Sequence, residues 1–492
     1  MKRITVNLSL LLLLLFGAVP GQAEDTQKDQ HRTPFKRVVV IFQENRTPDN
    51  LFQGLCAPPY GTSSSCSASP NGNQYDIQVN NWLNKASPTG VTQPTTVPLA
   101  NAYDLSHAHS AFVAQCDLDS SGMCKMDGAA GVTCAGACPA NPQFRYVDNS
   151  SGILNPYLTL ATQYGWANYM FQTNQGPSFP AHQFIFGGTS APNTADDGKG
   201  IYASENMTGT GGVGGQSKTA GCIADATTRV KLIMPDGTEN TSIYPCFEHD
   251  TMADILPSGI TWRYYAPSAG SIWTAPNAIS HICQSTGPGG RCVGADWKDN
   301  VDLKPADVLT HIANCQLRSL SWVIPTGANS DHARANDGGG PSWVASIVNA
   351  IGSNTTCDNG GYWKDTAILI TWDDWGGWYD HEPPTILQAP FGDYQLGFRV
   401  PMIFVSAYTQ PGYINNIRHD FGSILRFIEH NFGMRPGALG FADNRSTTDL
   451  TAFYDLSRTP RAFQPVAAPK TASFFIHDPR AATDPDDDGD DN

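Results

Sequence analysis

Two short runs of apolar residues constrain the fold of this chain more than any other feature. Residues 37–42 (RVVVIF) and 366–372 (TAILITW) are continuous and rich in β-branched and aliphatic side chains. Such runs are typical of strands that are buried on both faces, as in a parallel sheet. Further strands are expected at 259–265, 320–324 and 400–406, and helices at 152–168, 251–256, 305–317, 341–351 and 419–431. This alternation predicts an α/β fold with a mostly parallel central sheet and helices on both faces.

The first residues predict export. Lys2 and Arg3 precede an apolar run over 10–16, and small residues follow up to Ala23. This pattern is that of a secretory signal peptide over residues 1–23, and its apolar run is too short to span a bilayer comfortably. No later segment is uninterruptedly apolar over the ~18 residues of a membrane helix. We therefore expect a secreted or periplasmic protein with no integral membrane segment after signal removal.

The rest of the chain divides by composition. Residues 24–34 are polar and are expected to form a flexible arm, and residues 35–470 to form one domain. Within it, loop-rich insertions are expected over residues 55–150 and 200–250, where Gly, Pro, Ser and Asn are frequent. The acidic segment 471–492 is expected to be a disordered tail, because residues 484–492 are low in complexity and their like charges repel.

All twelve cysteines follow the predicted cleavage point. An even number in an exported chain indicates disulfide bonds. Close neighbours are plausible pairs, while the full connectivity stays open: Cys56 with Cys66, Cys134 with Cys138, and Cys283 with Cys292. A zinc cluster is the alternative for Cys116, Cys124, Cys134 and Cys138, but oxidation competes with thiolate ligation outside the cell.

The net charge of −15 argues against a nucleic-acid-binding protein. Loss of Lys2 and Arg3 with the signal peptide takes two positive charges away and gives −17. A chain this acidic is not attracted to an anionic membrane as a whole. The sequence does not indicate the oligomeric state.

Polar pairs follow both apolar runs. Glu44 and Asn45 come after the first, and Asp373 and Asp374 after the second. Ligands of open α/β sheets bind beyond the carboxyl ends of the strands, so these side chains are expected to meet there. Three carboxylates and an amide form a hard-oxygen site, and a cation would offset their mutual repulsion. Taken alone, an Asp-Asp pair after a strand is more often a turn or a helix cap, and Glu-Asn at a strand end is equally ordinary.

One serine and several histidines are candidates for chemistry. Ser178 lies in GPSFP (176–180), where glycine and two prolines restrict the backbone around the hydroxyl. A hydroxyl near a metal can act as a nucleophile, although a simple helix cap is the alternative. His107, His281, His332 and His381 lie in loops rich in Asp, Ser and Pro, where they could hold anionic oxygens or protonate a leaving group.

These clusters, in this order, resemble the bacterial phosphoesterase family that contains phospholipases C and certain acid phosphatases, which is similar in fold to the alkaline phosphatase superfamily. The resemblance runs from about Arg37 to Phe453. It is carried by QENRTPDNLF (43–52), GPSFP (176–180), TMADIL (251–256), GITWRYY (259–265), SDH (330–332), TWDDWGG (371–377), YDH (379–381), GFRVPM (397–402), HDFGSILRFIE (419–429) and DNRS (443–446).

The resemblance implies a function and assigns roles. The chain would be a secreted, metal-dependent phosphoesterase with an alkaline phosphatase-like fold, long disulfide-pinned loops and a catalytic domain over 35–470. Its substrate would be a phosphate monoester or a phospholipid. One divalent metal ion of unspecified identity would be held by Glu44, Asn45, Asp373, Asp374 and Ser178. Ser178 would also be the nucleophile, and His107, His332, His381 and, as a further candidate, His281 would surround the phosphate.

The chain departs from the family pattern at a few positions. Thr47 and Pro48 replace Ser-Phe, Ala181 stands where Asn is common, and Glu382 interrupts an Asp-His-Val-Pro-Pro run. None of these positions is an expected ligand. The alternative is a secreted binding or surface protein with a decayed site, and the filled metal and nucleophile positions argue against it.

Overall fold

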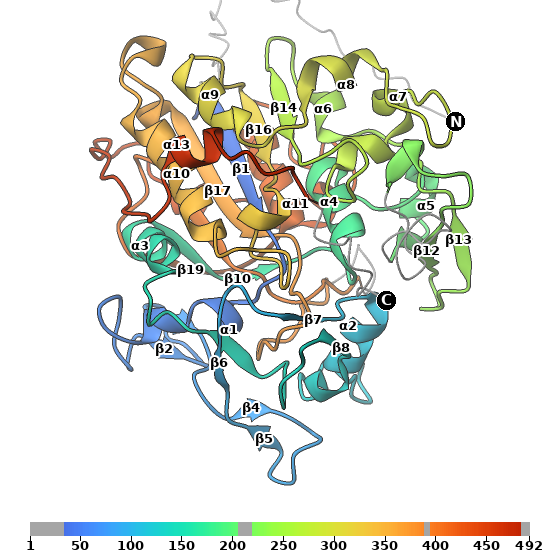
Figure 1. Cartoon of the computed structure of the whole chain (residues 1–492), viewed down its shortest axis with the longest axis vertical. Helices are drawn as coiled ribbons and strands as arrows, with labels where there is room; N and C mark the ends of the chain where they lie inside the picture. Colours follow the sequence, from blue (N-terminus) through green and yellow to red (C-terminus); the bar gives the residue numbers. More distant parts are fainter. Residues whose placement is uncertain (1–33, 205–218, 388–393, 484–492) are drawn as a thin grey trace, which may run out of the picture. The chain divides into compact units, whose positions relative to one another are not determined.

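An eight-stranded sheet forms the centre of the computed structural model, which describes residues 34–204, 219–387 and 394–483. The strand order is β15-β14-β16-β1-β17-β18-β10-β19. Figure 1 labels β14, β16, β1, β17, β10 and β19 of this sheet. The strands are β1 (Arg37–Gln43), β10 (Gly165–Phe171), β14 (Trp262–Tyr265), β15 (Val301–Asp302), β16 (Leu320–Val323), β17 (Thr366–Trp372), β18 (Met402–Val405) and β19 (Tyr413–Asp420). All neighbours pair in parallel except β18, which is antiparallel to both β17 and β10. The predicted mostly parallel sheet is confirmed.

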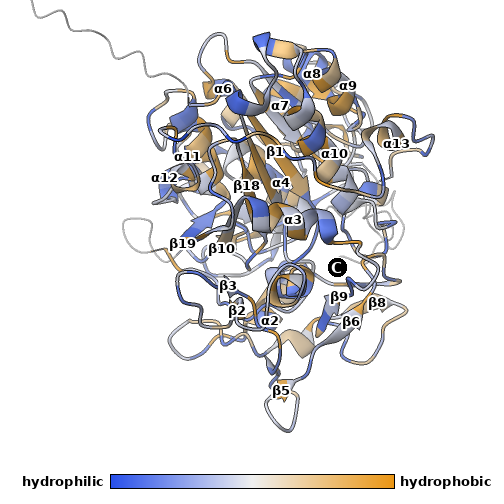
Figure 2. Ribbon diagram, turned by 90° about the vertical axis from the view of Figure 1, so that its left-hand side faces the viewer, coloured by the Kyte–Doolittle hydropathy of each residue, from blue (hydrophilic) through white to orange (hydrophobic). Residues whose placement is uncertain are grey.

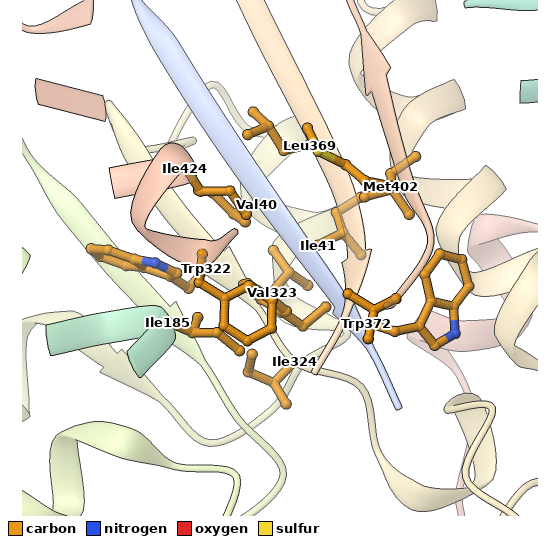
Figure 3. Packing of buried hydrophobic residues seen from close by; sticks show 14 of the residues in the cluster. Val40, Ile41, Ile185, Trp322, Val323, Ile324, Leu369, Trp372, Met402 and Ile424 are labelled. Atoms are coloured by element: carbon orange, nitrogen blue, oxygen red, sulfur yellow. The ribbon is translucent and has the colours of Figure 1, made fainter. Parts of the chain in front are cut away.

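The two apolar runs are the central strands. β1 and β17 are adjacent and parallel, with Phe42 opposite Thr371 and Gln43 opposite Trp372. Every residue of β17 and all of β1 except Arg37 are buried. Figure 3 shows side chains of these strands, such as Val40 and Leu369, packed against those of neighbouring strands and helices. Because both strands end at the same level, the residues after them are brought side by side.

Helices cover both faces of the sheet. One group consists of α3 (Asn155–Gln163), α9 (Asp307–Ala313), α10 (Gly340–Ser353) and α13 (Ala472–Ile476), and the other of α4 (Ser178–Gly187), α6 (Met252–Ile255), α11 (Phe421–Asn431) and α12 (Ala442–Arg445). In Figure 2 the sheet lies between α11 and α12 on one side and α9, α10 and α13 on the other. Hydrophobic residues concentrate in the central strands. Successive side chains of a strand point to opposite faces, so the burial of every β1 residue from Val38 to Gln43 requires both layers.

Several element boundaries differ from the sequence-based expectation, and three of the differences have an evident physical reason. The helix expected over 152–168 ends at Gln163, because its last apolar residues belong to β10. The helix expected from 419 begins at Phe421, where the Asp420 side chain accepts a hydrogen bond from Ser423 N and caps it. The start of the segment expected to be a disordered tail forms α13, because Phe475 is buried against Trp343 with ring centroids 5.2 Å apart.

The insertions contain short elements rather than long ones. Their strands are β2 (Cys66–Ser67), β3 (Tyr75–Asp76), β4 (Trp82–Leu83), β5 (Val91–Thr92), β6 (Thr95–Val97), β7 (Tyr103–Leu105), β8 (Cys134–Gly136), β9 (Arg145–Val147), β11 (Tyr202–Ala203), β12 (Val230–Ile233) and β13 (Thr241–Ile243). The helix α2 (His109–Cys116) belongs to the first insertion. Outside the insertions, α1 (Pro48–Leu51) follows β1, α5 (Thr194–Asp197) follows α4, and α7 (Ser280–Cys283) and α8 (Ala295–Asn300) follow β14. Short elements of this kind depend on cross-links and on packing against the sheet.

The described residues form six disulfides, of which the first four lie within these insertions: Cys56–Cys66, Cys116–Cys124, Cys134–Cys138, Cys222–Cys246, Cys283–Cys292 and Cys315–Cys357. The three expected local pairs are confirmed. The zinc alternative is not supported, because the four cysteines considered for it form two disulfides and no cysteine is free in the described part of the chain.

Some expectations fall outside the described residues. These are the signal peptide at 1–23, nearly all of the arm at 24–34, and the most acidic part of the tail at 484–492. Within the residues that the structure does describe, no helix is both long and apolar enough to cross a bilayer.

Candidate active site

The carboxyl ends of the parallel strands carry the candidate site. Glu44 and Asn45 directly follow β1, and Asp373 and Asp374 directly follow β17. Ser178 is the first residue of α4, which follows β10 and its connecting loop. β10 runs parallel to β1 and β17, so its carboxyl end lies at the same edge of the sheet. All five residues predicted to bind a metal therefore extend from one edge.

Glu44, His182 and Asp373 form a compact group of possible metal ligands. Each contributes one ligand atom, and these atoms all lie within 4.8 Å of one another. Nε2 of His182 is 3.4 Å from Oε1 of Glu44 and 3.8 Å from Oδ2 of Asp373. All three side chains have 0% exposure. Buried charges at this spacing require compensation, which a divalent cation would provide.

His182 is a site residue that sequence reasoning missed. It lies four residues after Ser178 in α4, so both side chains are on one face of that helix. The i, i+4 spacing was a usable signal. The prolines at 177 and 180 made this segment resemble a turn, and the helical register is only evident in the structure.

Ser178 contacts the carboxylate group directly. Its Oγ donates to Oδ2 of Asp374 at 3.4 Å, and Oδ1 of Asp374 accepts from Gly376 N at 2.7 Å. Burial, together with the negative charge of Asp373, raises the pKa of Asp374 well above its usual range. Two neighbouring buried carboxylates are thus costly to ionise unless a cation is present. This donor set fits a divalent metal.

Asn45 is held in a conformation that aims its amide toward the site. Its φ is 63°, in the left-handed region that Asn tolerates better than most residues. Its backbone N donates to Oδ1 of Asp373 at 3.1 Å, and its Nδ2 donates to Nε2 of His107 at 2.9 Å. Its buried Oδ1 accepts no hydrogen bond from the described residues. That oxygen is suited to bind a cation.

A glycine pair allows the loop after Asp374 to approach Asn45 closely. Gly376 and Gly377 have φ of 62° and 70°. A Cβ on Gly376 would lie 2.4 Å from the carbonyl oxygen of Asn45, and one on Gly377 would lie 2.5 Å from Cβ of Leu105. Only glycine permits this backbone conformation at such short distances.

Two of the four predicted histidines join the site. Nδ1 of His107 donates to the carbonyl of Leu105 at 2.9 Å, which leaves Nε2 as the acceptor for Asn45. The ring of His332 lies 5.8 Å from that of His107, centroid to centroid. Positive charge on either ring would lower the pKa of Asp374, so both are close to that carboxyl.

His381 belongs instead to a second buried group. Its Nδ1 is 2.7 Å from Oδ2 of Asp49 and its Nε2 is 3.1 Å from Oδ1 of Asp76. Arg399 pairs with Asp380 and Asp76 in the same group. Burial opposes protonation of His381, but the two carboxylates outweigh it and raise its pKa to about 10. No described ion pair or hydrogen bond connects His381 to the residues around Ser178, so this position fits a structural role.

His281 lies in a partly exposed cluster. Its Nδ1 is 2.7 Å from Oε1 of Glu248, and its Nε2 is 3.0 Å from Oδ1 of Asp254. The hydrogen bond to Asp254 and the one to Glu248 raise its pKa to about 9, against the effect of partial burial. Both ring nitrogens are engaged, and the structure does not bring His281 to Ser178 through any contact among the described residues.

The role of His381 makes stability depend on pH. Its pKa is raised from 6.5 to about 10, so its contribution is complete below pH ~6.5 and is lost as pH rises through ~10. We expect His381→Gln to lower the free energy of unfolding by about 3 kcal/mol near neutral pH and by much less near pH ~10. Chemical denaturation at several pH values measures this. The exposed His477→Gln is the control, and a pH-independent loss would contradict the assignment.

Comparison with known proteins identifies the family of this chain. The model of the Phosphoesterase family matches residues 35–435. This chain belongs to the Phosphoesterase family. It is 26% identical to the non-hemolytic phospholipase C of Pseudomonas aeruginosa, over 41% of this chain and 32% of that protein. It is 25% identical to phospholipase C B of Mycobacterium tuberculosis, over 33% of this chain and 34% of that protein.

The expected family is confirmed, although this phosphoesterase chain matches only about a third of the length of these two relatives. A solved structure of an alkaline phosphatase superfamily protein from Vibrio parahaemolyticus is 11% identical, with a TM-score of 0.32. That match covers 60% of this chain and 65% of the other.

Proposed function

We propose that this protein hydrolyses phosphate esters, with Ser178 as the nucleophile and one divalent metal ion as cofactor. One observation carries the proposal: a buried serine hydroxyl contacts Asp374, next to the compact group of Glu44, Asp373 and His182. Membership in the Phosphoesterase family supports the reaction class. A serine nucleophile beside carboxylates gathered for a cation is the arrangement that such a reaction requires.

The residues divide the chemistry among them. When bound, the metal would favour the ionised form of the Ser178 hydroxyl and neutralise charge on the phosphoryl oxygens. Ser178 Oγ attacks phosphorus, the ester P–O bond breaks, and a phosphoseryl group forms. Water then attacks phosphorus, the bond to Ser178 breaks, and the serine regains its proton. The buried surroundings strengthen each electrostatic contact in these steps.

The two site histidines have different roles in this proposal. His107 is fixed as a hydrogen-bond acceptor by Leu105, so it orients the Asn45 amide. His332 has Nδ1 2.7 Å from the Ala333 carbonyl and 3.8 Å from Oδ2 of Asp104. The Asp104 carboxylate would stabilise a protonated ring. His332 is therefore the better candidate to protonate the leaving ester oxygen, so that it departs as the alcohol.

Export fits the same proposal. The amino-terminal pattern of residues 1–23 is that of a signal peptide, and six disulfides suit an oxidising compartment. We propose a secreted or periplasmic phosphoesterase.

A phospholipid substrate is the candidate that one cavity favours. A cavity of about 680 Å³ adjoins the segment leading to Ser178. Its lining is mixed: the apolar and aromatic side chains of Tyr202, Ile233, Met234 and Tyr394 lie beside the charged Asp197, Lys199 and Arg445. Apolar and aromatic side chains suit the lipid part of a leaving group, and the relatives compared above are named phospholipases C. A small phosphate monoester would not need this surface.

A two-substrate assay tests the proposal. We expect the mature protein to release p-nitrophenol from p-nitrophenyl phosphate, from p-nitrophenylphosphorylcholine, or from both. Chelation should remove about 99% of the activity, and added divalent ions should restore it, because the cation stabilises the charge of the transition state. The ratio of the two rates assigns the monoesterase or the phospholipase C class. Absence of hydrolysis with every divalent ion would favour the binding-protein alternative.

A further inference from the structure

We propose that His182 is a nitrogen ligand of the metal and that it makes the site prefer later transition-metal ions such as Zn²⁺ or Co²⁺ over Mg²⁺ and Ca²⁺. The inference deepens the proposed function and rests on it for the presence of a metal. His182 lies outside the all-oxygen ligand set that the family resemblance implies.

The hydrogen bonds around His182 determine which nitrogen carries a lone pair. The Tyr264 hydroxyl donates to the carbonyl of Trp273 at 2.8 Å, so its hydrogen is already committed. Nδ1 of His182 lies 3.3 Å from the same hydroxyl oxygen, which can only accept from it. Nδ1 therefore carries the ring hydrogen, and Nε2 presents its lone pair. A fixed tautomer of this kind is the usual feature of a metal-binding histidine.

That lone pair faces negative charge. Nε2 is 3.4 Å from Glu44 and 3.8 Å from Asp373, and both distances are longer than an N–H···O hydrogen bond. Nε2 of His182 and Oδ2 of Asp373 are buried and have no hydrogen-bond partner among the described residues. A nitrogen lone pair and carboxylate oxygens turned toward one another repel. A cation among these atoms removes the repulsion and satisfies all of them.

The surroundings hold the imidazole in this orientation. Its ring stacks near Trp273 with centroids 6.2 Å apart and lies 6.4 Å from Phe42. The helix places His182 one turn after Ser178, so the ligand nitrogen and the nucleophile move as one unit. A rigid nitrogen donor costs little entropy to bring to the metal.

The identity of this donor decides the preference for metals. Carboxylate and amide oxygens suit Mg²⁺, Ca²⁺ and Mn²⁺, whereas imidazole suits Zn²⁺ and other transition ions. An oxygen set that gains one imidazole should bind the transition ions more tightly and Mg²⁺ little better than before. His182 would thus determine which metal is selected without being part of the nucleophilic step.

Metal binding to chelator-stripped, full-length mature protein tests the inference. We expect pulsed EPR of the Mn²⁺ form to show coupling to a histidine nitrogen in the wild type and none in His182→Gln. The affinity for Co²⁺, measured by its visible absorption, should fall about 10- to 100-fold in that variant. The affinity for Mg²⁺ should change about threefold or less, since oxygen ligands dominate its binding.

Two further variants separate ligation from general damage. Tyr264→Phe removes the acceptor of Nδ1 and should keep the nitrogen coupling while weakening Co²⁺ binding about tenfold. His281→Gln is the matched control, because that histidine is partly exposed and held by two other carboxylates. It should bind both ions as the wild type does. Thermal unfolding of the metal-free proteins shows whether each variant is folded.

The outcomes distinguish this inference from the proposed function. Nitrogen coupling in a folded His182→Gln equal to that of the wild type, or unchanged Co²⁺ affinity, overturns the role of His182 even if esters are hydrolysed. Nitrogen coupling that depends on His182 in a protein without esterase activity supports the ligand and overturns the proposed reaction. A wild type that binds no divalent ion overturns both.

Discussion

Replacing Ser178 with alanine is expected to lower kcat on both p-nitrophenyl substrates by about 10³-fold or more. Alanine is compatible with the first position of α4, so the helix should be retained. The variant loses the only hydroxyl that contacts Asp374 among the described contacts. Without it no phosphoseryl group can form, and a direct attack by water would lack the positioned nucleophile. Release of p-nitrophenol under saturating substrate and metal measures the loss.

A matched serine provides the control. Ser321 is equally buried, lies in β16, and its hydroxyl has no hydrogen-bond partner in the described structure. Ser321→Ala should retain the wild-type rate. Acid-quenched wild-type enzyme should carry phosphate on the peptide containing Ser178, detected by mass spectrometry. Wild-type turnover by a folded Ser178→Ala would show that another group is the nucleophile.

Asp373→Asn is expected to remove the metal and lower activity by about 100-fold or more. Asn is nearly isosteric and keeps an oxygen to accept from Asn45 N, so the loop should hold its shape. It removes one negative charge from a cluster in which Glu44, Asp374 and Asp373 are all buried. Elemental analysis and the two-substrate assay measure both losses.

The thermal stability of the metal-free Asp373→Asn variant provides an independent test of the role of Asp373. In the metal-free protein Asp373 repels Asp374 and contributes to raising its pKa, so removing that charge should stabilise the fold. We expect chelated Asp373→Asn to unfold at a higher temperature than chelated wild type, and to gain little on addition of metal. Asp455→Asn, at an exposed position, should change neither quantity. A chelated variant that is less stable than wild type would argue for a purely structural role of Asp373.

Much of the fold could be predicted from local patterns. Short runs of β-branched and aliphatic residues are typical of buried strands. The two runs of this chain form β1 and β17, at the centre of the sheet. The polar residues directly after them had to lie at the ends of those strands. The ends of individual helices and strands were harder to predict, because the apolar residues of β10 continue the spacing of those in α3 without a break.

Some residues of the site could likewise be predicted from their neighbours in the sequence, and others could not. The sequence by itself determined that Glu44, Asn45, Asp373 and Asp374 follow strands, since that depends only on neighbours along the chain. Only the tertiary structure decided which histidines meet them: His107, His182 and His332 do, whereas His381 and His281 pair with other carboxylates. The reason is physical. A histidine in a loop can reach any partner that strand order, helix register and burial bring near it, and those long-range pairings are not encoded in its immediate neighbours.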